Sequence, residues 1–138
     1  MESVTVLESL GGLTSFFLHF VAAGVLVALF TLIYVRVTPY PEFRLIREGK
    51  VAPAISFSGA LLGFVIALAG AIVSSVSFVD MVVWAVIALV VQIVVFLVLK
   101  AVFADLSRDI AENMPAPAIL LGALSLAAGI LTAASLTY

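Results

Sequence analysis

Residues 81–99 read MVVWAVIALVVQIVVFLVL, a run of 19 residues without a charged side chain between Asp80 and Lys100. About 20 apolar residues in a helix cross the roughly 30 Å hydrocarbon core of a bilayer. A helix is expected there because it pairs its backbone N–H and C=O groups within the segment, and lipid offers no other partners. This stretch therefore predicts a transmembrane helix.

Three further stretches are free of charge and long enough to cross a bilayer, namely Ser9–Val35, Val51–Val79 and Asn113–Tyr138. The whole chain has 138 residues, of which 65% are hydrophobic and 10% are charged, and its mean hydropathy is +1.38. Such a composition is typical of a membrane protein and far from that of a soluble domain. We predict an all-α integral membrane fold with four transmembrane helices, in which residues 1–138 form a single membrane domain.

The composition also excludes several classes of function. The formal net charge is −2, so the chain lacks the basic surface that binding to nucleic acid requires. Cysteine is absent and histidine occurs once, which excludes disulfides, thiolate chemistry and zinc sites built from these residues. We expect no cofactor, no metal centre and no nucleic-acid partner, and membrane lipids as the immediate surroundings.

The distribution of basic residues predicts the orientation. All six lie in two of the loops, which are therefore expected to be cytoplasmic by the positive-inside rule; they are Arg36, Arg44, Arg47, Lys50, Lys100 and Arg108. Both termini are then periplasmic or extracellular. No basic residue precedes the first apolar stretch, so we expect it to be a transmembrane helix that is retained and not a signal peptide.

An internal repeat relates the two halves of the chain. A shift of 64 residues aligns residues 44–70 with 108–134 without a gap, and 10 of these 27 positions are identical, including the run APAI at 52–55 and 116–119. Shared Leu, Ile and Ala could arise from composition, whereas the shared Arg, Glu and Pro are harder to explain so. We interpret the chain as two tandem parallel two-helix repeats, at about 13–75 and about 79–138, related by an axis along the membrane normal.

The connector between the two helices of each unit is charged and amphipathic. Arg44 and Glu48 are four residues apart, as are Arg108 and Glu112, so each pair is expected to share one face of a short helix. Such an exposed pair contributes only about 0.3 to 0.5 kcal/mol. We favour a positioning role for these residues, with contact to lipid headgroups or to a cytoplasmic partner as the alternative.

The second and fourth apolar stretches are rich in small residues. Gly59 and Gly63 form a Gly-x-x-x-Gly step, and the repeat places Ala123 and Ala127 at the matching positions. Small residues let helix backbones approach closely, which is how helices associate where lipid removes the hydrophobic driving force. We therefore predict that these two helices form the inner pair and that the other two face lipid.

Few polar residues lie within the spans, and no Asp, Glu, Lys or Arg does. Gln92 is expected to make an interhelical hydrogen bond, since an unpaired amide in hydrocarbon is costly. Ser56 and Ser58 are expected to bond to helix carbonyls, with a hydroxyl-lined path in an oligomer as the alternative. His19 lies four residues after Ser15, but neither an orienting group nor an oxyanion hole is visible nearby, so we expect no enzyme activity.

The residues Thr38-Pro39, Leu45-Ile46 and the run AISFSGALLG at 54–63 resemble the bacterial inner-membrane family called domain of unknown function 350. The resemblance covers nearly the whole chain. It implies an inner-membrane protein built from tandem two-helix units and carries no catalytic residues. It also implies an envelope-stress role beside cytoplasmic membrane-remodelling proteins.

Two functions from different classes are compatible with these features. The first is a structural or partner-docking membrane protein, expected to be a homo-oligomer, whose connectors present charged surface to the cytoplasm. The alternative is a subunit of a homo-oligomeric channel or transporter. Such a channel would have to be an oligomer, because four closely packed helices leave no water-filled path within one copy.

Overall fold

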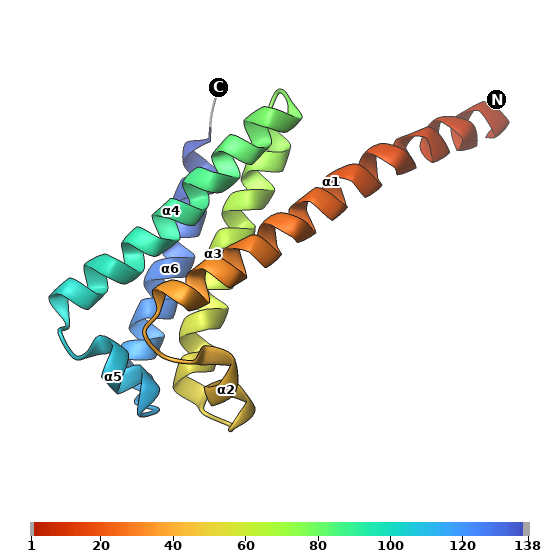
Figure 1. Cartoon of the computed structure of the whole chain (residues 1–138). Coiled ribbons are helices and arrows are strands. Elements are labelled where there is room, and N and C mark those ends of the chain that lie inside the picture. The colour runs from red at the N-terminus through yellow and green to blue at the C-terminus, as the bar shows by residue number, and fades with distance from the viewer. Residues whose placement is uncertain (1, 137–138) are drawn as a thin grey trace.

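The computed structural model describes residues 2–136, with side chains from residue 5 onward, and all its elements are helices (Figure 1). Their bounds are α1 Glu2–Val37, α2 Glu42–Arg47, α3 Val51–Ser74, α4 Phe78–Val102, α5 Leu106–Ala111 and α6 Pro115–Ser135. Four of them, α1, α3, α4 and α6, are long and apolar enough to cross a membrane. The predicted all-α architecture with four candidate spans is confirmed.

The helices α3 and α6 form the centre of the bundle and run in the same direction. Gly59 lies against Gly122 near the start of both helices, and Gly70 lies against Ala133 near their ends. Helix α4 packs on both members of this pair. The short helices α2 and α5 lie at the same end of the bundle, opposite the two chain termini (Figure 1).

Helix α1 packs on the bundle only through its second half. Phe30 and Tyr34 are fully buried, and the Phe30 ring stacks on Phe64 with 4.5 Å between centroids. Every residue from 5 to 21 is exposed, and this part of α1 leans away from the other helices (Figure 1). Its 36 residues extend about 54 Å, more than the roughly 30 Å of hydrocarbon that a single crossing requires.

The turn between α3 and α4 is set by a reciprocal cap. The Ser77 hydroxyl accepts a hydrogen bond from the Asp80 backbone N–H at 3.1 Å, and the Asp80 carboxylate accepts one from the Val76 N–H at 3.2 Å. These bonds satisfy N–H groups that have no partner within the first turn of a helix. The arrangement begins α4 and reverses the chain within three residues.

The connector helices α2 and α5 end in the same way. Gly49 and Asn113 follow them with φ values of 85° and 67°, in the left-handed region. In each case the next N–H closes back on the helix: Lys50 donates to the Leu45 carbonyl, and Met114 to that of Asp109. This is the Schellman ending, which favours Gly or Asn at the left-handed position. Each connector therefore contains a short helix with a regular hydrogen-bonded ending and is not an irregular loop.

Asn113 also ties the two halves of the chain together, because its side-chain oxygen accepts a hydrogen bond from the Ala52 N–H at the start of α3, at 2.9 Å. We expect Asn113→Gly to lose only this cap, at about 1 kcal/mol of unfolding free energy. Gly49→Ala should add only the strain of a side chain at positive φ, about 1 to 2 kcal/mol. Asn113→Ala should combine both losses. Denaturation in detergent measures all three, and equal losses for the two Asn113 variants would contradict this assignment.

Candidate functional site

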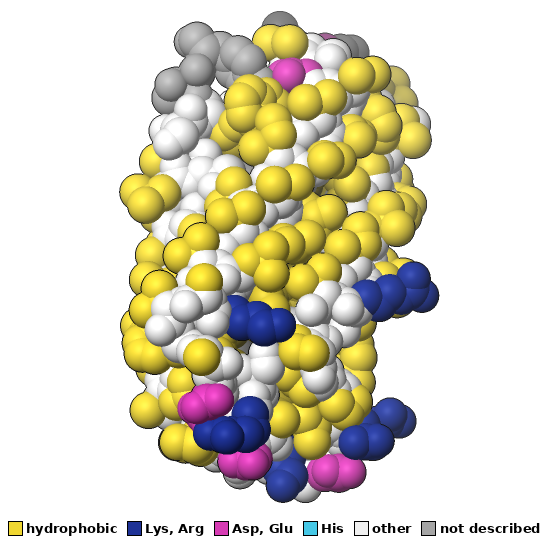
Figure 2. Space-filling model, turned by 60° about the vertical axis from the view of Figure 1, so that its left-hand side comes forward, with side chains coloured by type: hydrophobic (Ala, Val, Ile, Leu, Met, Phe, Trp, Pro, Cys, Tyr) yellow, Lys and Arg dark blue, Asp and Glu magenta, His cyan; other side chains and the backbone are white. Residues whose placement is uncertain are grey.

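Charged side chains gather at the connector end of the molecule (Figure 2). On α2, Arg44 and Glu48 form the predicted pair, with 3.9 Å between Nε and Oε1, and both are exposed. On α5 the predicted pairing of Arg108 with Glu112 is wrong. Arg108 instead lies 3.2 Å from Asp105 and 3.7 Å from Asp109. The carboxylate of Asp105, three residues before Arg108, is closer to the guanidinium than one placed four residues after it.

The opposite side of each connector is buried and, apart from Glu42 on α2, apolar. Leu45 on α2 and both Leu106 and Ile110 on α5 are among the buried residues of the core. Their burial holds the two short helices against the bundle, which is needed because six residues are too few for a stable isolated helix. The connector surface, which we define as the outward-facing charged side chains of α2 and α5 and their caps, is therefore held in place by the core.

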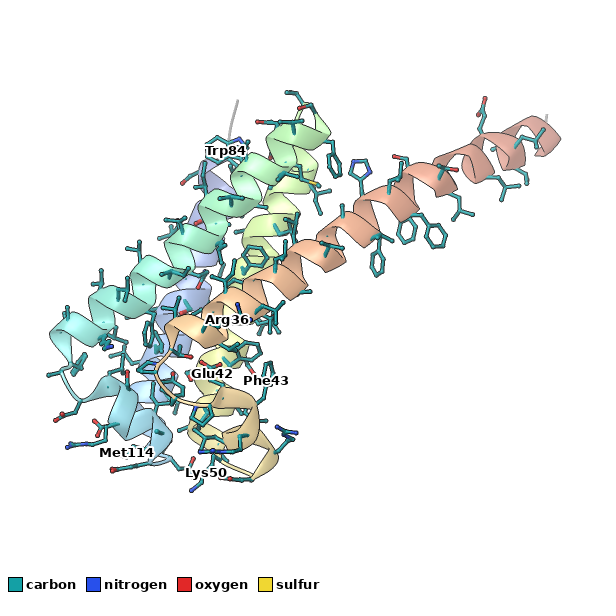
Figure 3. All side chains as sticks on the ribbon, in the orientation of Figure 1. Arg36, Glu42, Phe43, Lys50, Trp84 and Met114 are labelled. Atoms are coloured by element: carbon teal, nitrogen blue, oxygen red, sulfur yellow. The ribbon has the colours of Figure 1, made fainter. Side chains whose placement is uncertain are left out.

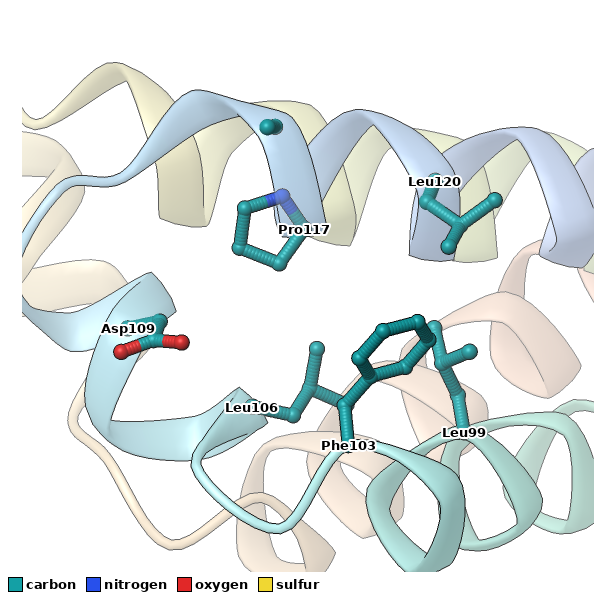
Figure 4. A pocket seen from close by; sticks show the side chains of 7 residues that line it. Leu99, Phe103, Leu106, Asp109, Pro117 and Leu120 are labelled. Carbon is teal, nitrogen blue, oxygen red and sulfur yellow. The ribbon is translucent and has the colours of Figure 1, made fainter.

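A cleft of about 290 Å³ opens between the end of α4, α5 and the start of α6 (Figure 4). Its lining is apolar except for one carboxylate, and it consists of Leu99, Phe103, Leu106, Asp109, Ala116, Pro117 and Leu120. Phe103, directly after α4, is half exposed here. The cleft suits an apolar side chain or part of a lipid tail beside the connector surface.

The contact between α3 and α6, which we call the inner seam, is formed on α6 by a face that lies one helix position away from the predicted one. Gly59 and Gly63 lie in it as expected, but Ala123 and Ala127 are exposed. Gly59 instead contacts the backbone of Gly122, and Gly63 contacts the backbones of Ser125 and Gly129. Glycine at positions 122 and 129 lets α6 approach more closely than alanine would, because a Cβ there would overlap or crowd the α3 backbone.

Gln92 makes an interhelical hydrogen bond, as predicted. The side chain is 1% exposed, and its Nε2 donates to the Ser125 carbonyl on α6 at 3.0 Å. Its Oε1 has no hydrogen-bond partner among the described residues. The amide therefore fastens α4 to the inner pair at the level of Gly63 and lies within the packed bundle.

Two substitutions of Gln92 should distinguish the contribution of its hydrogen bond to stability from the cost of burying a carboxyl group. Gln92→Leu loses one interhelical bond and also removes an unpaired buried oxygen, so the unfolding free energy should change by no more than about 1 kcal/mol. Gln92→Glu places a carboxyl group in the same buried site, where it must be protonated to donate to the Ser125 carbonyl, and we expect a loss of about 3 kcal/mol or more at neutral pH. Denaturation in detergent measures both, and equal effects would contradict this role of the amide.

The remaining intramembrane polar residues do not come together. Ser56 is buried and donates to the Pro53 carbonyl at 3.1 Å, whereas Ser58 and His19 are exposed. The Nδ1–H of His19 donates to the Ser15 carbonyl at 2.8 Å, while the Ser15 hydroxyl lies 3.5 Å from the same nitrogen. A protonated Nδ1 is not a base for that hydroxyl, so this pair lacks the geometry of a nucleophilic dyad.

The sequence prediction missed a buried carboxylate. Glu42, the first residue of α2, is 2% exposed, and both carboxylate oxygens lack a hydrogen-bond partner within residues 5–136 (Figure 3). Burial raises its pKa to about 7, and the Thr38 hydroxyl acts in the opposite direction. The signal lay in the repeat: Glu42 aligns with Leu106, an apolar residue that faces the core.

Comparison with known proteins places this architecture in a family. The family model described as Domain of Unknown Function (DUF350) matches residues 8–136. The UPF0719 inner membrane protein YjfL of Escherichia coli K12 is 36% identical over 129 residues, which cover 94% of this chain and 98% of that protein. YjfL of E. coli O157:H7 matches to the same extent. No solved structure matches. The chain therefore belongs to the DUF350 family.

Proposed function

We propose that this protein is a structural, partner-docking protein of the bacterial inner membrane, without enzyme activity, whose connector surface is its working part. The observation that carries the proposal is the folding of both connectors into capped helices. Each is held by buried side chains and presents charge at the same end of the molecule. Folding a charged connector into an ordered helix lowers its conformational entropy. A segment that only linked two helices would not need this order.

The proposal includes the tandem arrangement of two units. Helices α2 and α5 have six residues each and begin 64 residues apart, at Glu42 and Leu106. The left-handed residues Gly49 and Asn113 are separated by the same 64 positions. These equal spacings support a duplication with both copies in one orientation, which brings the two connectors to one side of the membrane.

The proposal also includes a cytoplasmic location for the connector surface and a location of both termini outside. Support comes from the sequence, in which all six basic residues lie within residues 36–50 and 100–112, by the positive-inside rule. The name of the E. coli relative supports the inner membrane as the compartment.

We further propose that copies of the chain associate with one another. The first connector, residues 36–50, carries four basic and two acidic residues, and the second, residues 100–112, carries two basic and three acidic residues. Their formal charges are thus +2 and −1, and opposite charge favours contact between the first connector of one copy and the second of the next.

Single-cysteine pairs test this contact cleanly, because the chain has no cysteine. We expect Phe43→Cys and Ala104→Cys, which are exposed on the two connectors and keep every charge, to cross-link to a dimer in native membranes when coexpressed on separate copies. Val76→Cys with Ser135→Cys, at the opposite end, serves as the matched control and should cross-link much less. Equal cross-linking of both pairs, or none, would contradict the proposed association.

Flux measurements distinguish the docking role from the channel alternative. We expect liposomes containing the purified protein to show the same ion and proton leak as empty liposomes, because the seam between α3 and α6 is closed by backbone contacts. Native mass spectrometry of the same sample gives the oligomer that was tested. Flux that scales with protein content would replace the docking role with a channel.

A further inference from the structure

One group of polar side chains lies inside the connector end and has no part in the docking role. It surrounds Glu42 and consists of Tyr34 from α1, Thr38 and Tyr40 from the turn that follows, and Ser56 from α3, all of them buried. The hydroxyls of Tyr34 and Tyr40 and both oxygens of Glu42 have no hydrogen-bond partner in the described part of the chain. The cluster therefore contains a carboxyl group with unused bonding capacity.

No basic side chain compensates a charge at this position. The nearest basic residues along the chain, Arg36 on α1 and Lys50 before α3, form no ion pair with Glu42 within the described residues, and Arg44 pairs with Glu48. The titratable groups beside Glu42 are Tyr34 and Tyr40, both neutral when protonated. An ionised carboxylate that is buried without a partner costs several kcal/mol, and such a group binds a proton instead.

Two of the neighbouring hydroxyls, those of Thr38 and Ser56, are arranged to accept a hydrogen bond from an acid. The Thr38 hydroxyl donates to the Val35 carbonyl at 3.2 Å, and the Ser56 hydroxyl donates to that of Pro53. Both hydroxyl protons are engaged, so these oxygens offer lone pairs toward the cluster. A carboxylic acid can donate to such an oxygen, whereas a carboxylate cannot.

The second half of the chain shows that the fold does not need this cluster. At an offset of 64 residues, Glu42 aligns with Leu106, which is also buried and also begins its connector helix. The other four members align with apolar residues; Tyr34, Thr38, Tyr40 and Ser56 correspond to Val98, Val102, Ala104 and Leu120. An apolar residue satisfies packing at this position, so the polar group in the first half has another use.

We propose that Glu42 is a proton-binding site that controls the position of α2. In the bound state the neutral acid is packed among the hydroxyls of the cluster. On release, the carboxyl O–H bond breaks, the proton passes to water at the connector end, and the carboxylate that remains draws the start of α2 out of the bundle toward water. The proposal does not depend on the docking role, although α2 carries half of the connector surface.

The titration itself is measured by infrared difference spectroscopy of the full chain in lipid. We expect a band from the protonated carboxyl of Glu42 that disappears with a midpoint near pH 7, where burial places its pKa. Glu42→Gln should lack this band, whereas Glu48→Gln, at the exposed pair with Arg44, should keep it. A band that persists in Glu42→Gln, or a wild-type carboxyl that titrates entirely in the ordinary acidic range, would overturn the proposal.

Hydrogen exchange tests the movement. Exchange of the α2 amides is divided by that of the α5 amides in the same molecule, because both helices have six residues and the same ending. Between about pH 6 and about pH 8 we expect this ratio to rise at least about threefold in the wild type and to stay constant in Glu42→Gln. Glu42→Leu, which copies Leu106, is the second variant should glutamine disturb folding. The same pH dependence in wild type and variants would overturn the proposal.

A metal cation is the competing ligand for a carboxylate among hydroxyls. Replacing sodium and potassium by choline should leave the infrared midpoint unchanged, since a proton needs no cavity. A midpoint that follows the sodium or potassium concentration would assign the site to a monovalent cation and overturn the proton assignment.

Discussion

Gly63→Ile is expected to cost more than about 3 kcal/mol of unfolding free energy and to separate α3 from α6. A Cβ on Gly63 would overlap the Ser125 backbone and crowd the Gln92 amide at 2.7 Å, so both the inner seam and its fastening to α4 would be disturbed. Backbone atoms cannot move aside as the end of a flexible side chain can. Reversible denaturation in mixed micelles measures the loss.

Gly24→Ile is the matched control for this prediction. Gly24 lies within α1, where a Cβ would have no atom within 4 Å, so the same substitution should change the unfolding free energy by less than about 0.5 kcal/mol. Gly129→Ile, which meets the Gly63 backbone from the other side, should match Gly63→Ile. Similar stability of all three variants would show that α3 and α6 do not pack through these glycines.

The second large effect is a dependence of stability on pH that comes from Glu42. Its pKa is raised from 4.5 to about 7 by burial, so the folded protein holds the proton more tightly than the unfolded chain. The stabilisation is full below about pH 4.5, decreases as pH rises toward 7 and is absent above that value. At 1.36 kcal/mol per pKa unit the change is on the order of 3 kcal/mol.

Replacing the carboxyl group isolates this contribution. We expect Glu42→Leu to abolish the decrease between these pH values and to make the protein more stable than the wild type at about pH 8, because no carboxylate has to be desolvated. Glu48→Leu removes an exposed carboxylate and should leave the decrease in place. Denaturation across the pH range measures both variants, and an unchanged decrease in Glu42→Leu would contradict the assignment to Glu42.

Much of this architecture can be predicted from sequence because charge and length are strong signals in a membrane. The charge-free runs predicted all four long helices, and the cost of an unpaired amide in lipid predicted that Gln92 would bond to another helix. Leu106 and Ile110, four residues apart and therefore on one side of α5, are both buried. Each of these conclusions can be reached from the sequence of a single helix.

The features that escaped prediction depend on how segments meet. Alignment of the repeat indicated Ala123 and Ala127 as seam residues, but a helix can rotate by one position and bring Gly122 and Gly129 to the seam instead. A carboxylate is expected on the exposed side of a helix, and only the alignment of Glu42 with the buried Leu106 pointed the other way. Likewise, nothing in its composition indicated that the first half of α1 would leave the bundle.

Impermeant thiol labelling of intact cells tests the central claim, that the chain crosses the membrane four times with the connector surface in the cytoplasm. The absence of natural cysteine makes single substitutions unambiguous, and Arg47→Cys and Val76→Cys, exposed at opposite ends of the bundle, are suitable positions. We predict that a maleimide confined to the outside labels Val76→Cys in intact cells, and labels Arg47→Cys only after the membrane is opened. Labelling of Arg47→Cys in intact cells would contradict the account.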